Sequence, residues 1–330
     1  MGTSVLYYSA HPHIIELILS HIPYSALGAV GATCKGLRAS VAAIQSQHLI
    51  LSPLVGDELL VRTPLGRLPG LYSIIFRGDM AKELARIKLF TDHTTVLDVQ
   101  GFVGGNINLT RLAPAFPNLE TYRAITDPLD QSFTPYFPLP CKTLVIFYNE
   151  DGPNPGGMRD ADDFDSDYED FDDEDKIIPE GVIPAVPEGV RKTVVNMKGD
   201  DVPVADFFPC IFNFPTSVQD FVIVFPFYEL GKARGRFFNF TAPIIVMDTV
   251  ELVGTDAMYT LVGLDEASRG FNMLQHMRAQ LGRWEFTGDK SKQECINERL
   301  DHVRIRTKAE YAKSVKDIEL ETVEHIYRAR

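Results

Sequence analysis

The residues that could carry out chemistry in this chain of 330 residues are scattered along it. Gly101-Phe102-Val103-Gly104-Gly105 follows a predicted strand, which is where a phosphate-binding turn begins in dinucleotide-binding folds. The GxGxxG spacing fails, however, and Pro114 interrupts the long helix that should come next. We therefore interpret these glycines as turn residues.

The side chains that commonly act as acids, bases or nucleophiles are also dispersed. Asp98 and Asp248 lie in or beside predicted strands, with no candidate base or nucleophile near them in the sequence. The histidines occur singly, except for His11 and His13, and no Walker, HExxH or GxSxG sequence is present. Because no acid, base and nucleophile come together, we expect a protein that is not an enzyme and needs no cofactor.

The cysteines give no reason to expect a metal site or a disulfide framework. They are Cys34, Cys141, Cys210 and Cys295, with no CxxC spacing among them, whereas structural zinc sites need paired ligands a few residues apart. Residues 1–10 lack the basic region and long apolar core of a secretory signal. No apolar run approaches the ~20 residues that span a bilayer. We expect a cytoplasmic or nuclear protein with reduced thiols and no membrane partner.

The negative charge is concentrated in one stretch. The formal net charge is −13, and residues 150–175 contain 13 acidic residues against one basic residue, Arg159. The rest of the chain holds 32 acidic and 31 basic residues, so it is nearly neutral. A nucleic-acid-binding domain would instead show a basic patch or stripe. We therefore expect no nucleic-acid partner.

Residues 150–178 are predicted to form a disordered insertion, because like charges repel and aliphatic residues are few. Three interpretations stay open for this stretch: a solvated spacer, a docking site for a basic protein, and an acceptor for an acid-directed kinase at Ser166. In the docking interpretation Phe164, Tyr168 and Phe171 are the apolar anchors. A chaperone for basic proteins would rest on the same residues.

The N-terminal residues are predicted to form three short helices. Pro12 suits a first helical turn, aliphatic residues follow at helical spacing, and Pro23 ends the first helix. Ser25 and Thr33 are possible N-caps of the second and third helices, with Gly31 interrupting the second. Three helices of this size cannot bury all their aliphatic side chains among themselves. Part of that apolar surface should be covered by another structure.

At these residues the chain resembles an F-box of the fungal type. The pattern is a proline, an Ile-Leu-x-x-Leu run, a Leu in the second helix and Cys-Lys opening the third; this chain departs from it at His11, Ile15 and Leu37. The resemblance implies that these helices bind a Skp-type adaptor on a cullin scaffold. The adaptor-binding residues it implies are Pro12, Ile15, Ile18, Leu19, Ile22, Leu27 and Val30, with Cys34 and Lys35 at the edge. An N-terminal helical cap on a larger domain is the alternative.

Short strand-like segments recur after residue 95. They begin at Val96, Leu119, Leu144, Val194, Phe221 and Val250, at intervals of 23, 25, 50, 27 and 29 residues. The acidic stretch lies inside the longest interval. A period in the twenties is typical of leucine-rich repeats, so we predict an α/β (α+β) fold with an irregular leucine-rich-repeat-like solenoid. Unrelated strands of an ordinary α/β domain are the alternative.

The expected organisation is therefore a helical domain at 1–50, a repeat-like domain at 51–149 and 179–330, and the insertion at 150–178. Within it, 49–76 is predicted as a connection, and amphipathic helices are predicted after Asp79 and at 265–281, the second ended by Gly282. Segments 284–286 and 302–306 are strand candidates, and a helical turn is predicted at 307–315.

The predicted function is substrate recognition for a Skp–cullin–F-box type ubiquitin ligase. The adaptor would bind the N-terminal helices, and an unidentified protein substrate would bind the repeats. The chain would perform no bond chemistry, because positioning substrate lysines near a charged ubiquitin carrier is sufficient. The alternative function is a stand-alone protein-interaction scaffold.

Overall fold

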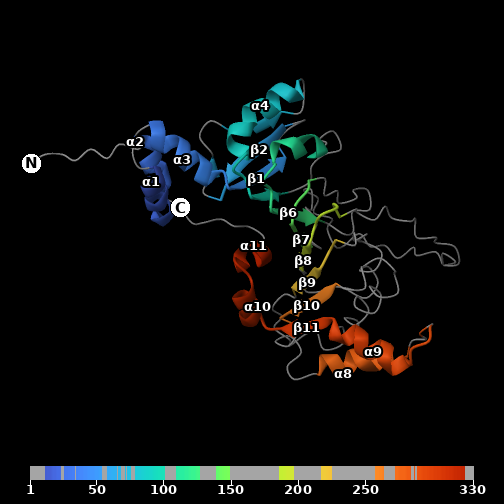
Figure 1. Cartoon of the computed structure of the whole chain (residues 1–330). Coiled ribbons are helices and arrows are strands. Elements are labelled where there is room, and N and C mark those ends of the chain that lie inside the picture. Colours follow the sequence, from blue (N-terminus) through green and yellow to red (C-terminus); the bar gives the residue numbers. More distant parts are fainter. Residues whose placement is uncertain are drawn as a thin grey trace, which may run out of the picture.

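The computed structural model shows a mixed α/β fold built on one large sheet (Figure 1). It describes residues 12–23, 26–33, 35–53, 58–64, 66–67, 71, 73–75, 79–100, 109–126, 139–148, 186–196, 217–224, 257–263, 272–283, 286 and 288–323. The acidic insertion predicted at 150–178 and the strand predicted at 250–253 lie outside these residues.

Among the described residues the sheet has eleven strands, and its parallel part follows the order of the chain without reversal. The order is β11-β10-β9-β8-β7-β6-β5-β1-β2-β3, and β4 pairs with β2 beside this path. The parallel strands are β1 (His48–Pro53), β5 (Val96–Val99), β6 (Thr121–Thr126), β7 (Thr143–Tyr148), β8 (Lys192–Asn196), β9 (Asp220–Val224), β10 (Met258–Val262) and β11 (Val303–Arg306). Each new strand is therefore added beside the previous one at the growing edge.

The prediction that 49–76 is a connection is wrong. This region holds β1 and the antiparallel strands β2 (Glu58–Thr63), β3 (Gly66–Arg67) and β4 (Ser73–Ile75). The residues of β2 alternate between half-buried and buried, as expected for a strand with one face in the core. Pro53 and Gly66, two of the Pro and Gly residues in this region, lie within strands β1 and β3.

One face of the sheet packs against helices and forms the main core. Its strand residues are apolar, among them Leu97, Leu144 and Ile223. The helices that cover them are α4 (Met80–Thr91), η3 (Leu109–Ala115), α8 (Met273–Leu281) and α9 (Lys292–Asp301). Asp79 caps α4 as predicted, because its carboxylate accepts hydrogen bonds from the backbone N–H groups of Ala81 and Lys82. Ile87 and Phe90 are buried on the face of α4 that the spacing predicted.

In the C-terminal part of the fold, only some of the elements predicted from the sequence are observed. The strand at 302–306 and the helix after Thr307 are confirmed as β11 and α10 (Lys308–Ser314). Gly282 follows the end of α8 as predicted, but Leu274, predicted on the buried face of α8, is exposed. Residues 264–271 and 284–285 lie outside the described part. Neither β10, α9 nor α11 (Ile318–Thr322) was predicted.

The N-terminal helices α1 (Pro12–His21), α2 (Leu27–Thr33) and α3 (Lys35–Gln45) form a small cluster of their own. Leu19, Leu27 and Val41 are its buried centre. Gly31 was predicted to interrupt the second helix, but α2 continues through it. A Cβ on Gly31 would lie 3.3 Å from the side chain of Val41, so the glycine allows α2 and α3 to approach closely. Thr33 is the last residue of α2, and its hydroxyl donates to the carbonyl of Val30.

Candidate functional site

The first candidate interaction surface is an apolar stripe on α1. Ile14, Leu17 and Ile18 are 40%, 60% and 47% exposed, and their i, i+3 and i+4 spacing places them on one side of the helix. Leu19 on the opposite side is buried with Leu27. The helical cluster therefore leaves large aliphatic side chains in solvent although it has a core of its own.

The residues predicted to bind an adaptor divide between this stripe and the small core. Ile18 and Lys35 are exposed, whereas Leu19 and Leu27 are buried. Half-buried positions are Ile15, Ile22 and Val30. Pro12 begins α1, and Cys34 lies outside the described residues. Ile14 and Leu17, which the resemblance did not include, belong to the exposed stripe.

The second candidate surface is the face of the sheet opposite the main core. Residues in register across it are Ile50, Asp98, Arg123, Val145, Val194, Val222 and Thr260. The row is charged at β5 and β6 and apolar from β7 to β9. It therefore differs from the core face, where the strand residues are almost all apolar.

Asp98 and Arg123 form a buried ion pair in this row. They are 3% and 1% exposed, and Arg123 Nη1 lies 3.0 Å from Asp98 Oδ1 and 2.8 Å from Oδ2. His48 Nε2 lies 3.1 Å from Asp98 Oδ1. The guanidinium also lies over the ring of Phe147, 5.1 Å from its centroid. Burial lowers the pKa of Arg123, and the neighbouring Asp98 carboxylate opposes that shift.

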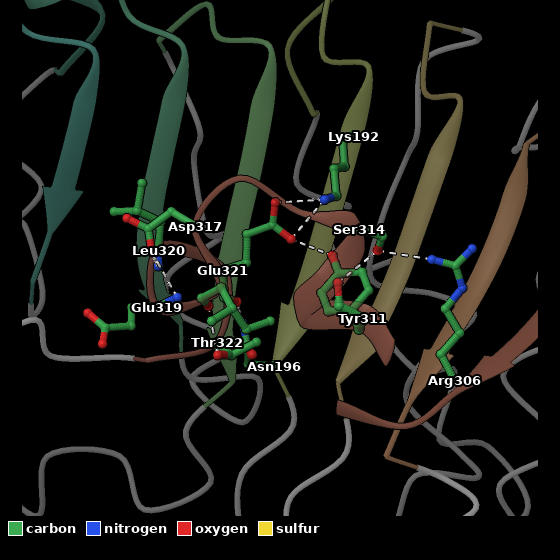
Figure 2. A network of polar contacts seen from close by, with 11 residues as sticks. Lys192, Asn196, Arg306, Tyr311, Ser314, Asp317, Glu319, Leu320, Glu321 and Thr322 are labelled. Atoms are coloured by element: carbon green, nitrogen blue, oxygen red, sulfur yellow. Dashed lines mark hydrogen bonds and ion pairs between the residues drawn. The ribbon is translucent and has the colours of Figure 1, made fainter. Parts of the chain in front are cut away.

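The apolar part of this face is covered by residues 307–323, which we call the C-terminal segment. We call the strand residues beneath it, Val145, Phe147, Val194, Val222, Val224 and Val262, the apolar floor; all are buried. Tyr311 of α10 is buried against this floor, and the half-buried Val315 and Ile318 also pack against it. Figure 2 shows α10 and α11 lying across the strands.

Glu321 of α11 is the centre of the polar contacts that hold the C-terminal segment. Its carboxylate lies 2.6 and 2.8 Å from Lys192 Nζ, and it accepts a hydrogen bond from the Tyr311 hydroxyl (Figure 2). Asn196 Nδ2 donates to the Glu321 carbonyl at 2.8 Å, and Arg123 Nη2 donates to the Val323 carbonyl. One short segment thus bridges β6 and β8, which lie on either side of β7.

Burial and the Glu321 carboxylate both raise the pKa of Tyr311, burial having the larger effect. The hydroxyl therefore stays protonated and can donate to Glu321 throughout the neutral range. Lys192 Nζ also lies 5.3 Å from the centroid of the Tyr311 ring. The tyrosine, the carboxylate and the ammonium therefore form one connected cluster.

The polar side chains of this face contact one another. The Asp98 carboxylate contacts both Arg123 and His48. Within those residues, no group of three or more His, Cys, Asp or Glu side chains is placed to hold a metal ion. None of the helices in the described ranges combines the length and apolar character needed to cross a bilayer.

Comparison with models of protein families, with curated proteins and with solved structures found no match. The site must therefore be understood from its residues alone. Sequence reasoning missed the cluster of His48, Asp98 and Arg123 because these residues are far apart in the chain and meet only through strand register. A charged residue at the third position of both 96–99 and 121–126 was the available signal.

Proposed function

We propose that this chain is the substrate-recognition subunit of a Skp–cullin–F-box type ubiquitin ligase. The observation that carries the proposal is the exposed stripe of Ile14, Leu17 and Ile18 on a helical cluster that already has its own core. Exposed apolar patches on soluble proteins mark interaction sites. The proposed partner on this stripe is a Skp-type adaptor, with Lys35 exposed at the start of α3.

The arrangement of the sheet supports a repeat-like substrate-binding region. Parallel strands in chain order, each beside the previous one, are the connectivity of a solenoid. Val96 pairs with Thr121 and Thr121 with Thr143, so these units are 25 and 22 residues long. In the proposed mechanism the chain holds a protein substrate near the ligase and raises the local concentration of its lysines.

The test is retention of a Skp-type adaptor by the full chain in a pull-down. The variant Leu17→Asp/Ile18→Asp should lower adaptor affinity at least ~30-fold, because burying a carboxylate in an apolar interface removes a central contact. Leu19→Asp is unsuitable, since Leu19 is buried in the helical cluster and the charge would unfold it.

Leu274→Asp on α8 is the matched control, because Leu274 is 42% exposed and far from α1 in the chain. It should retain the adaptor like the wild type. The proposal is wrong if the wild type does not retain the adaptor, or if the double variant on α1 binds it unchanged.

The second candidate function is a stand-alone interaction scaffold in which the N-terminal helices cap the sheet. It is favoured by Ala42 of α3, which packs against the main core, since terminal units of a repeat array need such caps. In that case the Leu17→Asp/Ile18→Asp variant should keep every partner that the wild type binds.

A further inference from the structure

We propose that the apolar floor and its polar rim form a binding surface for an acidic, aromatic-containing helical segment of a partner protein, and that the C-terminal segment is its resident occupant. The partner would bind after displacing residues 307–323. This inference deepens the proposed function, because it assigns the chemistry of the substrate segment and a way to control access to it.

The rim of the surface selects an acidic ligand. Lys192 is only partly exposed and engages both oxygens of the Glu321 carboxylate, so a neutral side chain at this place would leave the ammonium without its partner. Arg123 and Asn196 contact backbone carbonyls at the end of α11. Any helical end can supply those carbonyls, so they fix the position of the ligand while the carboxylate sets its identity.

The floor selects an aromatic residue. Tyr311 is buried in one cluster with six apolar side chains from β7 to β10. Its hydroxyl donates to the same carboxylate that Lys192 binds. A ligand therefore needs a tyrosine and an acidic residue that meet on one side, as Tyr311 and Glu321 do across the turn between α10 and α11.

Several features make the C-terminal segment displaceable. It contributes no strand, so its departure breaks no strand pairing in the sheet. Its helices α10 and α11 have only seven and five residues, which is too short to be stable without the surface beneath them. Val315 and Ile318 remain half-buried. The segment is held by a few strong contacts, and an equivalent set from another protein could replace them.

Covalent attachment gives the resident segment an advantage over a free ligand. A tethered occupant acts at an effective concentration of about millimolar. A partner segment therefore binds only in proportion to the open fraction of the surface. Weakening the resident contact should strengthen binding of a ligand added in trans.

The test uses the full chain and a fluorescent peptide of residues 307–323 with an amidated end. In anisotropy titrations the Glu321→Gln protein should bind this peptide about 10-fold or more tightly than the wild-type protein does, since loss of one charge partner weakens the resident segment by at least that factor. Glu319→Gln is the matched control: it lies exposed on the same helix and should behave like the wild type.

The peptide itself supplies the reciprocal test. A peptide carrying Glu321→Gln should bind the Glu321→Gln protein at least ~10-fold less tightly than the unchanged peptide. Equal binding of the two peptides, or equal binding of the unchanged peptide by the three proteins, would overturn the proposal.

Hydrogen exchange on the wild-type chain decides whether the segment opens by itself. Amides of residues 308–323 should exchange at least ~10-fold faster than those of β8 and β9. Glu321→Gln should accelerate exchange of the amides in the C-terminal segment and leave exchange in β8 and β9 unchanged. If the segment and the strands exchange together in both proteins, residues 307–323 are an integral part of the core and the proposal is wrong. No adaptor is present in these assays. Their outcome is therefore independent of the adaptor pull-down, and either proposal can fail while the other holds.

Discussion

The charged residues within the sheet show how much a single buried group depends on its partner. Arg123 is almost fully buried, yet it contacts the Asp98 carboxylate, the Val323 carbonyl and the ring of Phe147. A buried charge that loses its counter-ion retains the cost of leaving water without the compensating attraction. The pair therefore constrains the register of β5 and β6 even where a pair of apolar residues would be equally stable.

This argument gives a prediction at the residue scale. Asp98→Ala should lower the free energy of unfolding by about 3–5 kcal/mol in a urea titration, because it leaves Arg123 unpaired in the core. The double variant Asp98→Leu/Arg123→Leu should recover part of the loss. Glu120→Ala is the control: its pair with Lys142, at 2.9 Å, is exposed, and its loss should cost about 1 kcal/mol or less. Equal costs for the two single variants would show that Arg123 is solvated.

Helices and strands whose apolar residues repeat regularly along the sequence were predicted. Those whose formation depends on pairing with distant parts of the chain were not. The helix after Asp79 carries an N-cap and a regular apolar face, so its sequence and its structure agree. Leu119 was predicted to begin a strand, but β6 begins at Thr121, because Leu119 packs in the core just before it. The Pro- and Gly-rich region around β2 and β4 concealed strands whose pairing is decided by distant partners.

The close approach of α2 and α3 could not be predicted from the sequence, since a glycine within a helix ordinarily weakens it. The structure separates two glycines of α2: Gly28 has open space around it, and Gly31 faces Val41 at 3.3 Å. Gly31→Leu should destabilise the helical cluster by about 1–3 kcal/mol through overpacking. Gly28→Leu should stabilise it by up to about 1 kcal/mol, because leucine favours the helix. Thermal melts and hydrogen exchange of α2 and α3 measure the effect of each variant on stability. If both variants stabilise the cluster, or both destabilise it, the packing described for Gly31 is wrong.

Among the residues that the structure describes, the chain-ordered strands contact mostly their neighbours in the sheet, whereas the C-terminal segment reaches strands that are far from it in sequence. Its Val323 carbonyl meets Arg123, 200 residues away in sequence, while Glu321 meets Lys192. The segment thus joins β6 and β8, which are not neighbours in the sheet. The stability of the chain and the occupancy of its candidate binding surface are therefore coupled.

Buried weakly acidic side chains are predicted to make the folded molecule less stable at alkaline pH. Burial raises the pKa of the Cys141 thiol from 9.0 to about 12, and burial also raises the pKa of Tyr122 and Tyr311. In the unfolded chain these groups ionise near pH 9–10, whereas the folded chain keeps them protonated. The folded state then binds more protons, so its stability is complete below pH 9 and falls as the pH rises.

Urea titrations between pH 8 and 11 measure this loss. Ionisation of Cys141 alone should lower the free energy of unfolding by about 2–3 kcal/mol at pH 11. Cys141→Ala should therefore reduce the slope of the free energy of unfolding against pH. Cys295→Ala controls for removing a thiol. Tyr311→Phe should reduce the slope further and also accelerate hydrogen exchange of residues 308–323, because it removes the hydroxyl that donates to Glu321. A stability that stays constant from pH 8 to 11 would mean that these groups ionise equally in both states, which is incompatible with their burial.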